Sequence, residues 1–257
     1  MKYTDLIFDL YGTLVDIHTE ESDWVWEKCA SFFSENGVEI DGKALKEQYQ
    51  KEIALREGKM GQEYECYPDI PFDEVMECIF ARGGVKYAKD LAFKVSRMFR
   101  TLSTEYIRLY AGVRERLAEL REKGYKLWLL SNAQQVFTEY ELRDLDLYDS
   151  FDGVYLSSNY GVRKPDHRFY KVLIDEQNLD IKKCLMIGND RDTDIFGAKN
   201  LGMATLYMHT LLTPREQKEA DESLHPDREV DGTNHFEFEG DDWSVLAPLI
   251  DKICRKK

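Results

Sequence analysis

Short apolar runs that alternate with amphipathic segments constrain the fold of this chain most. Beyond Gly112 these runs are apolar along their whole length, as expected for parallel strands buried on both faces. Segments of about 10 to 12 residues with helical periodicity separate them, which is typical of βαβ units. We therefore predict an α/β fold with a parallel sheet. The predicted strands are 126–130, 151–156, 184–187 and 204–207, and the predicted helices are 113–123, 134–145, 166–177, 193–201 and 242–253.

The N-terminal part of the chain follows a different pattern. Leu6–Phe8 is a short apolar run that ends at Asp9, and Gly12 and Thr13 follow as a turn. From Thr19 to Arg108 the apolar residues recur with helical spacing, and we expect no strand there. The helices predicted in this part are 43–56, 72–81 and 88–106.

These patterns predict two structural units. Residues 1–15 and 109–257 are expected to form an α/β core, and residues 16–108 an all-helical unit inserted into it. The stretch 213–235 is poor in apolar residues and rich in charge, which indicates a solvated loop.

Composition narrows the class of protein further. The formal net charge of −14 works against binding to nucleic acids or anionic membranes. Five cysteines without a CxxC pair favour a reduced, cytoplasmic protein over a disulfide framework or a zinc ribbon. No apolar run approaches the ~20 residues that a membrane helix needs. We expect a cytoplasmic protein that acts on a small molecule, and the sequence leaves its oligomeric state open.

Polar side chains stand where the predicted strands end. Asp9 follows the first strand, Ser131 the second, Lys164 lies after the third, and Asp190 and Asp194 come after the fourth. Ligands of parallel sheets bind beyond the carboxyl ends of the strands. Carboxylates gathered there repel one another unless a cation lies among them, and Mg²⁺ takes such oxygen ligands together with phosphate. A carboxylate can also act as a nucleophile and form an aspartyl phosphate.

Four stretches of the sequence resemble the motifs of the haloacid dehalogenase (HAD) superfamily, whose members are hydrolases with an aspartate nucleophile. In chain order they are Phe8-Asp9-Leu10-Tyr11-Gly12-Thr13-Leu14, Leu129-Leu130-Ser131-Asn132-Ala133, Arg163-Lys164-Pro165-Asp166 with Phe169-Tyr170, and Ile187-Gly188-Asn189-Asp190 with Asp194-Ile195 and Gly197-Ala198. The helical unit lies between the first two motifs, where this family carries a helical cap. The resemblance implies a Rossmann-like core with an all-helical cap domain.

The resemblance also implies roles for these residues. Asp9 would be the nucleophile, Ser131 would hydrogen-bond the transferring group, and Lys164 would neutralise charge on nucleophile and substrate. The implied Mg²⁺ ligands are Asp9, the backbone carbonyl of Tyr11, Asp190 and Asp194. The expected substrate-binding positions are Gly12, Thr13 and Asn132. Tyr11 itself is counted among the catalytic positions.

Tyr11 departs from the phosphatase pattern, in which an aspartate two residues after the nucleophile acts as general acid and base. A phenol with an ordinary pKa of ~10 is a poor base at pH 7. Loss of general acid–base help typically costs ~10²–10⁴ in rate. Tyrosine at this position resembles the L-2-haloacid dehalogenase branch, in which a halide leaves as an anion and no metal is required.

Two features oppose the dehalogenase interpretation. Asp190 supplies a metal-binding aspartate that the dehalogenase branch lacks, and the chain has no arginine between Asp9 and Arg56, where that branch uses one to hold its substrate. We therefore expect Mg²⁺-dependent hydrolysis of a small phosphomonoester through an aspartyl phosphate on Asp9. The alternatives are a metal-independent dehalogenase of a small organic acid and a low-activity binding or regulatory member, and Tyr11 motivates both.

Overall fold

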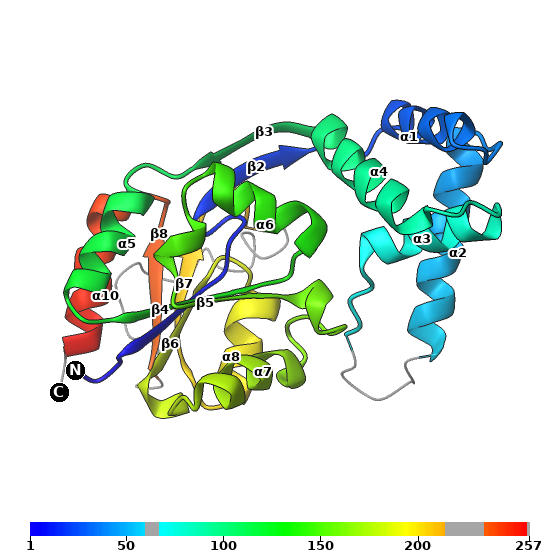
Figure 1. Ribbon diagram of the computed structural model, residues 1–257. Helices are drawn as coiled ribbons and strands as arrows, with labels where there is room; N and C mark the ends of the chain where they lie inside the picture. The colour runs from blue at the N-terminus through cyan, green and yellow to red at the C-terminus, as the bar shows by residue number, and fades with distance from the viewer. Residues whose placement is uncertain (60–66, 214–233, 256–257) are drawn as a thin grey trace.

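The computed structural model describes residues 1–59, 67–213 and 234–255. Within these residues the chain forms an α/β core and a group of four helices at one end of it (Figure 1). Most of the loop predicted over 213–235 and one of the five cysteines, Cys66, lie outside the described residues.

The core is built on a six-stranded sheet whose strands are all parallel, in the order β5-β4-β1-β6-β7-β8. Its strands are β1 (Asp5–Phe8), β4 (Lys126–Ser131), β5 (Gly153–Leu156), β6 (Cys184–Gly188), β7 (Ala204–His209) and β8 (His235–Glu239). The predicted α/β fold is confirmed. β8 was not predicted, because its sequence, HFEFE, alternates apolar and polar residues next to a highly charged stretch.

Helices cover both faces of the sheet. One face carries α5 (Val113–Glu122), α6 (Gln135–Asp144) and α10 (Trp243–Arg255), and the other carries α7 (His167–Gln177) and α8 (Gly197–Asn200). Shorter turns are η1 (Tyr148–Ser150), η2 (Ser157–Asn159), η3 (Ile181–Lys183) and the π-helix η4 (Arg191–Phe196). The helix predicted over 193–201 is thus divided between η4 and α8.

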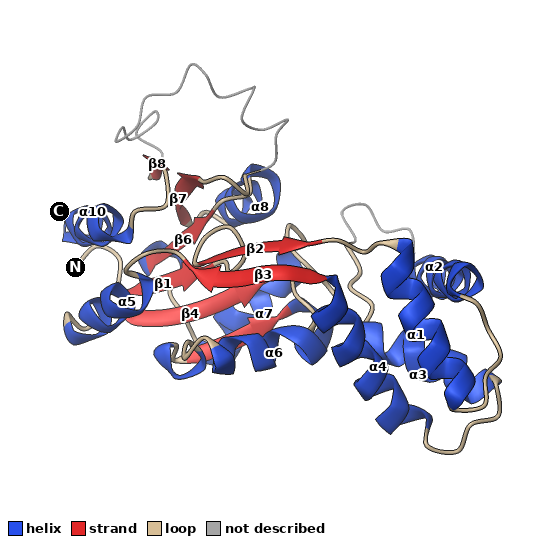
Figure 2. Cartoon of the chain, turned by 90° about the horizontal axis from the view of Figure 1, so that it is seen from above, coloured by secondary structure: helices blue, strands red, loops and turns tan. Residues whose placement is uncertain are grey.

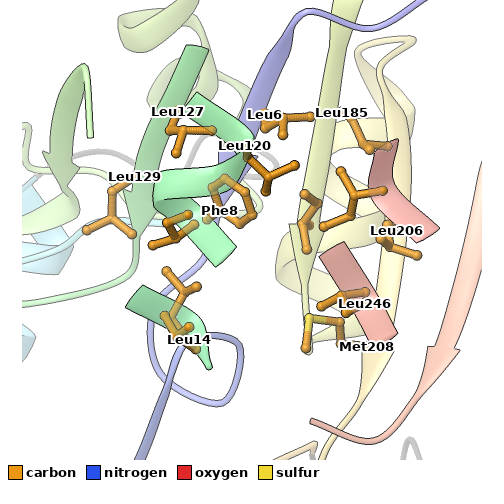
Figure 3. Packing of buried hydrophobic residues seen from close by; sticks show 14 of the residues in the cluster. Leu6, Phe8, Leu14, Leu120, Leu127, Leu129, Leu185, Leu206, Met208 and Leu246 are labelled. Carbon is orange, nitrogen blue, oxygen red and sulfur yellow. The ribbon is translucent and has the colours of Figure 1, made fainter. Parts of the chain in front are cut away.

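Successive residues of the central strand face opposite sides of the sheet, as the pleat requires. Leu6 and Phe8 lie in the hydrophobic cluster under α5 and α10, whereas Ile7 lies in the cluster under α7. Figure 3 shows Phe8 packed between leucines of the neighbouring strands and Leu120 of α5. This two-sided burial explains why the strand sequences are apolar throughout.

The four remaining helices are α1 (Asp23–Glu35), α2 (Gly42–Lys59), α3 (Phe72–Arg82) and α4 (Ala88–Ser103), which we call the helical insertion. They bury a hydrophobic cluster of their own, in which the rings of Phe33 and Phe80 stack with centroids 3.7 Å apart. Val136 and Phe137 of α6 belong to the same cluster, so the insertion also packs on the core.

Two strands join the insertion to the core, and they correct the sequence prediction. β2 (Val15–Thr19) pairs antiparallel with β3 (Thr104–Leu109), with Val15 opposite Leu109. The prediction of no strand between 19 and 108 is wrong, and the helix predicted to reach 106 ends at Ser103. Pairing between segments some 90 residues apart leaves no local periodicity, so the sequence pattern could not reveal it. Figure 2 shows the two strands running side by side toward the insertion.

Among the described helices, none is both long enough and apolar enough to cross a membrane. The cytoplasmic location expected from composition stays a prediction.

Candidate active site

Asp9 follows β1, at the carboxyl end of the central strand. Its backbone amide continues the sheet by donating to the carbonyl of Ile187, at 2.9 Å, and its side chain is only 11% exposed. Oδ1 accepts hydrogen bonds from Lys164 Nζ at 2.8 Å and Ser131 Oγ at 3.3 Å. Oδ2 accepts one long bond, of 3.4 Å, from Thr13 Oγ1. Three of the four motif stretches therefore meet at this carboxylate.

Lys164 connects Asp9 to the fourth stretch. Its side chain is 1% exposed, and Nζ donates to Asp9 Oδ1 at 2.8 Å, Asp194 Oδ1 at 2.6 Å and the carbonyl of Leu130 at 2.8 Å. An ammonium has three donors, and these acceptors use all of them. Two carboxylates share one ammonium here, so the cluster of Asp9, Lys164 and Asp194 carries a net charge of −1 when all three groups are ionised.

The charge balance of this cluster shifts the pKa values within it. Burial, together with the charge of Asp9, raises the pKa of Asp194 to about 7, although Lys164 opposes the shift. Burial opposes the charge of Lys164, but the carboxylates of Asp194 and Asp9 raise its pKa above the ordinary value. A buried cluster with one surplus negative charge takes up a proton readily, and Asp194 is the group that does so.

Asp190, which was expected to be a metal ligand, caps the π-helix η4. Its Oδ1 accepts from the backbone amides of Asp192 at 2.8 Å and Thr193 at 2.9 Å. Its own amide donates to Asp194 Oδ2 at 3.0 Å. In the part of the chain that the structure describes, no group of three or more His, Cys, Asp or Glu side chains is arranged to hold a metal ion. The expected ligands also include the backbone carbonyl of Tyr11, so Mg²⁺ binding by Asp9, Tyr11, Asp190 and Asp194 stays a prediction.

Asn189, the first residue after β6, lies beside Asp9 instead. Its Oδ1 accepts from Thr13 Oγ1 at 3.2 Å, and the same hydroxyl donates to Asp9 Oδ2. Gly12 has a positive φ of 86°, and an added Cβ would collide with the Asn189 side chain. Sequence reasoning passed over Asn189 in favour of Asp190, although the position directly after a strand was the available signal.

The Tyr11 hydroxyl is held by residues that sequence reasoning did not single out. It donates to the Glu141 carboxylate of α6 and lies 2.8 Å from Thr138 Oγ1. Arg100 of α4 pairs with the same carboxylate through Nε, at 2.5 Å, and its guanidinium lies 5.5 Å from the centre of the Tyr11 ring. Burial, and next the charge of Glu141, raise the pKa of Tyr11 above its usual value. The phenol therefore stays protonated and engaged at neutral pH.

Asn132, expected to bind substrate, holds the loop that carries Lys164. Its Nδ2 donates to the carbonyl of Lys164 at 2.9 Å, and its Oδ1 accepts from the Lys164 amide at 2.7 Å. This two-way clamp fixes the backbone of the lysine while the ammonium reaches Asp9. A contact of Asn132 with substrate stays a prediction.

A cavity of about 380 Å³ lies at the junction of the core and the helical insertion, and we call it the entrance cavity. Residues adjacent in sequence to the Asp9 cluster line its core side, among them Tyr11 and Asn132. Asp69 and Arg100 line it from the insertion, and Arg163 lines it next to Lys164. The cavity is thus bounded by both parts of the molecule.

A family model described as haloacid dehalogenase-like hydrolase matches residues 6–202, which is more than half of the chain. The chain belongs to this family. It is therefore a hydrolase of the haloacid dehalogenase superfamily, and the resemblance on the four motifs is confirmed. The matched range contains Asp9, Ser131, Lys164 and Asp194.

The relatives of this haloacid dehalogenase-like hydrolase include dehalogenases and phosphatases. The (S)-2-haloacid dehalogenase of Pseudomonas sp. strain YL is 29% identical over 206 residues, 79% of this chain and 82% of that protein. The glyceraldehyde 3-phosphate phosphatase of Pyrococcus abyssi is 35% identical over 102 residues, so the match spans only 43% of that phosphatase and 40% of this chain. The 2-haloacid dehalogenase of Pseudomonas syringae pv. Tomato DC3000 has the same fold, with a TM-score of 0.62 at 17% identity over 97% of this chain and 99% of that one.

Proposed function

We propose that this hydrolase removes halide from a small 2-halogenated carboxylic acid through an ester on Asp9, without a metal ion. The engagement of the Tyr11 hydroxyl by Glu141 and Thr138 carries the proposal. A phenol that stays protonated and bonded to a carboxylate offers little acid–base help to a poor leaving group. Halide departs as an anion and requires no proton, so this site suits it.

The contacts around Asp9 suggest how each step proceeds. Oδ1 is bound by Lys164 and Ser131, whereas among the described residues Oδ2 accepts the long bond from Thr13 alone, so Oδ2 is the oxygen that attacks. It forms a bond to the carbon that bears the halogen, the carbon–halogen bond breaks, and halide leaves with the electron pair. Water then adds to the ester carbonyl of Asp9, which releases a 2-hydroxy acid and a proton and restores the carboxylate.

Two features of the sequence, the aspartate at position 190 and the lack of an arginine between Asp9 and Arg56, oppose dehalogenation less in light of the side-chain contacts. The Oδ1 atom of Asp190 accepts two hydrogen bonds from the backbone amides of η4, which makes Asp190 less suited to bind a metal ion. A metal-binding aspartate is the feature that the dehalogenase branch lacks. Arg163, an arginine outside residues 9–56, lines the entrance cavity. The (S)-2-haloacid dehalogenase relative, matched over most of both chains, also supports the proposal.

We also propose that the helical insertion acts as a cap, with residues 16–108 as the inserted domain. Its residues Asp69 and Arg100 line the entrance cavity, which supports a role in enclosing the substrate. Enclosure would exclude bulk water during the first step. Small organic acids fit a cavity of about 380 Å³, whereas polymeric substrates do not.

Halide release from (S)-2-chloropropionate in EDTA tests the function directly. We expect Asp9→Asn to abolish release, and Asp175→Asn, an exposed carboxylate on α7, to leave it unchanged. In a single turnover in heavy-oxygen water, the first product should carry ordinary oxygen, because Asp9 supplies it. Release that persists in Asp9→Asn, or heavy oxygen in the first product, would contradict the ester.

The Mg²⁺-dependent phosphatase expected from the sequence is the second candidate, and the match to glyceraldehyde 3-phosphate phosphatase favours it. A panel of phosphomonoesters with and without Mg²⁺ distinguishes it, and Tyr11→Asp should raise hydrolysis of alkyl phosphates more than of aryl phosphates. Phosphate release that EDTA stops would replace the first proposal. Release of neither halide nor phosphate would favour a binding or regulatory member.

A further inference from the structure

An anionic substrate faces an unfavourable charge balance near Asp9. The cluster of Asp9, Lys164 and Asp194 carries a net charge of −1 when all three groups are ionised, and Asp69 adds a carboxyl group to the wall of the entrance cavity. Arg100 offers little compensation, because Glu141 takes up its guanidinium at 2.5 and 3.2 Å. A small organic anion therefore needs a different cation in this cavity.

Arg163 provides that cation. Its side chain lines the entrance cavity. Within the described part of the chain, the guanidinium of Arg163 forms no hydrogen bond or ion pair. Arg163 also lines a second cavity, of about 350 Å³. Asp69 and Gln134 line both cavities as well, so Arg163 stands where the two cavities meet. Its five N–H donors match the fork geometry of a carboxylate.

The backbone on both sides of Arg163 is fixed. Its amide donates to the carbonyl of Tyr67 at 2.9 Å, and the preceding residue, Val162, forms an antiparallel bridge with Pro68. The next residue, Lys164, is held by the Asn132 clamp. The backbone of Arg163 is thus ordered, and its exposed side chain lines the entrance cavity from the position directly before Lys164.

Asp69 lies close enough to influence Arg163 without neutralising it. Burial raises the pKa of Asp69, and the positive charge of Arg163 opposes that rise. The carboxylate oxygens are already engaged by Gln134 Nε2, at 2.8 Å, and by the Ser157 hydroxyl. Arg163 keeps its donors for a ligand.

We propose that Arg163 is the anion-binding residue of the entrance cavity and holds a charged group of the substrate. This inference rests on the proposed function for the identity of the substrate. The anion held is either the substrate carboxylate or the departing halide, because both are small anions that a guanidinium binds.

Equilibrium binding tests the site independently of turnover. Calorimetry would compare propionate with its neutral isostere propionamide on the wild type, Arg163→Gln, Arg163→Lys and the control Arg97→Gln, an arginine of the separate cavity between α3, α4 and α6. We expect the wild type to favour propionate, and Arg163→Gln to weaken propionate binding roughly tenfold or more. Arg163→Lys should recover part of the affinity, and Arg97→Gln should bind as the wild type does.

Equal binding of propionate by Arg163→Gln and the wild type would overturn the inference, as would a wild type that does not distinguish propionate from propionamide. With (S)-2-chloropropionate, a raised KM at constant kcat in Arg163→Gln would support the carboxylate as the anion held. A lowered kcat that falls further for chloride than for bromide would support the halide. Propionate binding that depends on Arg163, in an enzyme that releases no halide, would refute the proposed function alone.

Discussion

The position of Tyr11, two residues after Asp9, indicated a departure from the phosphatase pattern. The sequence did not indicate which side chains contact its hydroxyl. Its hydroxyl lies against Glu141 and Thr138, two residues one helical turn apart on α6. The guanidinium of Arg100 completes the group from the insertion. The side chain therefore joins the loop after β1, α6 and α4, and under the proposed function we expect its role to be structural.

Tyr11→Phe tests that role. We expect kcat for halide release to stay within a few fold of the wild type, because no proton passes through the phenol. The free energy of unfolding should fall by about 1–3 kcal/mol, since a bond to a charged partner is lost. Urea denaturation and the pH profile of kcat measure both effects. Tyr140→Phe, which alters a half-exposed tyrosine of the same helix, is the control. A hundredfold loss of kcat would show that Tyr11 takes part in the chemistry.

Asp194 gives a pH dependence whose sign follows from its raised pKa. The folded protein holds a proton on this carboxyl up to about pH 7, whereas the unfolded chain releases it near pH 4. The corresponding stability is present at low pH and is lost as the pH rises from about 4 through 7. Asp194→Asn should remove this slope, which can reach ~1.4 kcal/mol per pH unit.

Urea denaturation of the wild type and Asp194→Asn at several pH values between 4.5 and 7.5 measures the difference in slope. Asp175→Asn serves as the exposed control, and its slope should match that of the wild type. Parallel stability curves for Asp194→Asn and the wild type would show that Asp194 does not titrate in this range.

At the residue scale, the sequence predicted which side chains lie at the strand ends around Asp9 better than it predicted the contacts of Asn189 and Asp190. Asp9 directly follows β1 and Ser131 ends β4, and the parallel order brings the carboxyl ends of neighbouring strands together. Asn189 and Asp190 are neighbours in the sequence, yet the side chain of Asn189 accepts from Thr13 and that of Asp190 caps η4. Sequence periodicity does not resolve loop geometry to that precision.

At the scale of elements, a short segment of the insertion adds a third connection to the core besides β2 and β3. Asp69 donates its amide to the carbonyl of Gly161 at 3.1 Å, next to the Pro68–Val162 bridge. The side chain of Gln134 accepts from the amide of Phe72 at 2.7 Å and donates to Asp69 and to the carbonyl of Ile70. The start of α3 is thereby tied to the loop before α6.

Gln134→Ala should loosen this connection. Three hydrogen bonds are lost, and the Phe72 amide and one acceptor of Asp69 lose their partner, so we expect a destabilisation of about 2–4 kcal/mol. Hydrogen exchange should accelerate at the Phe72 amide more than at amides of β4. Gln135→Ala, which removes a hydrogen bond to the half-buried Glu139 of the same helix, is the matched control. Unchanged exchange at Phe72 would contradict the connection.

Elements with strong local patterns were predictable, and elements that depend on distant partners were not. The buried strands and the amphipathic helices α5, α6 and α7 were predicted to within a few residues. β3 and β8 have mixed polarity and are strands because β2 and β7 supply the backbone partners. Side-chain spacing carries no information about such partners.

At the scale of the whole molecule, the proposed function needs no metal ion, and Lys164 pairs with both carboxylates of the charge cluster beneath the insertion. We therefore expect EDTA and Mg²⁺ to leave the Tm unchanged to within about 1 °C. Binding of an ion to the folded state alone would raise stability by about 2.7 kcal/mol at a hundredfold excess over its Kd, which shifts the Tm by several degrees. Differential scanning calorimetry with each additive measures this, and such a shift with Mg²⁺ would restore the magnesium site.

The position of β1 in the sheet has a consequence for biosynthesis. This strand needs β4 and β6 on its two edges, yet Lys126 is made about 120 residues after Asp5 and Cys184 later still. At ribosomal rates of about 5–20 residues per second, the first strand waits roughly 6 to 24 s for its earliest neighbour. The intervening helices bury their own cluster around Phe33 and Phe80, so they can collapse during that interval. The nascent chain would thus fold the helical insertion before the parts of the core on either side of it can assemble into the sheet.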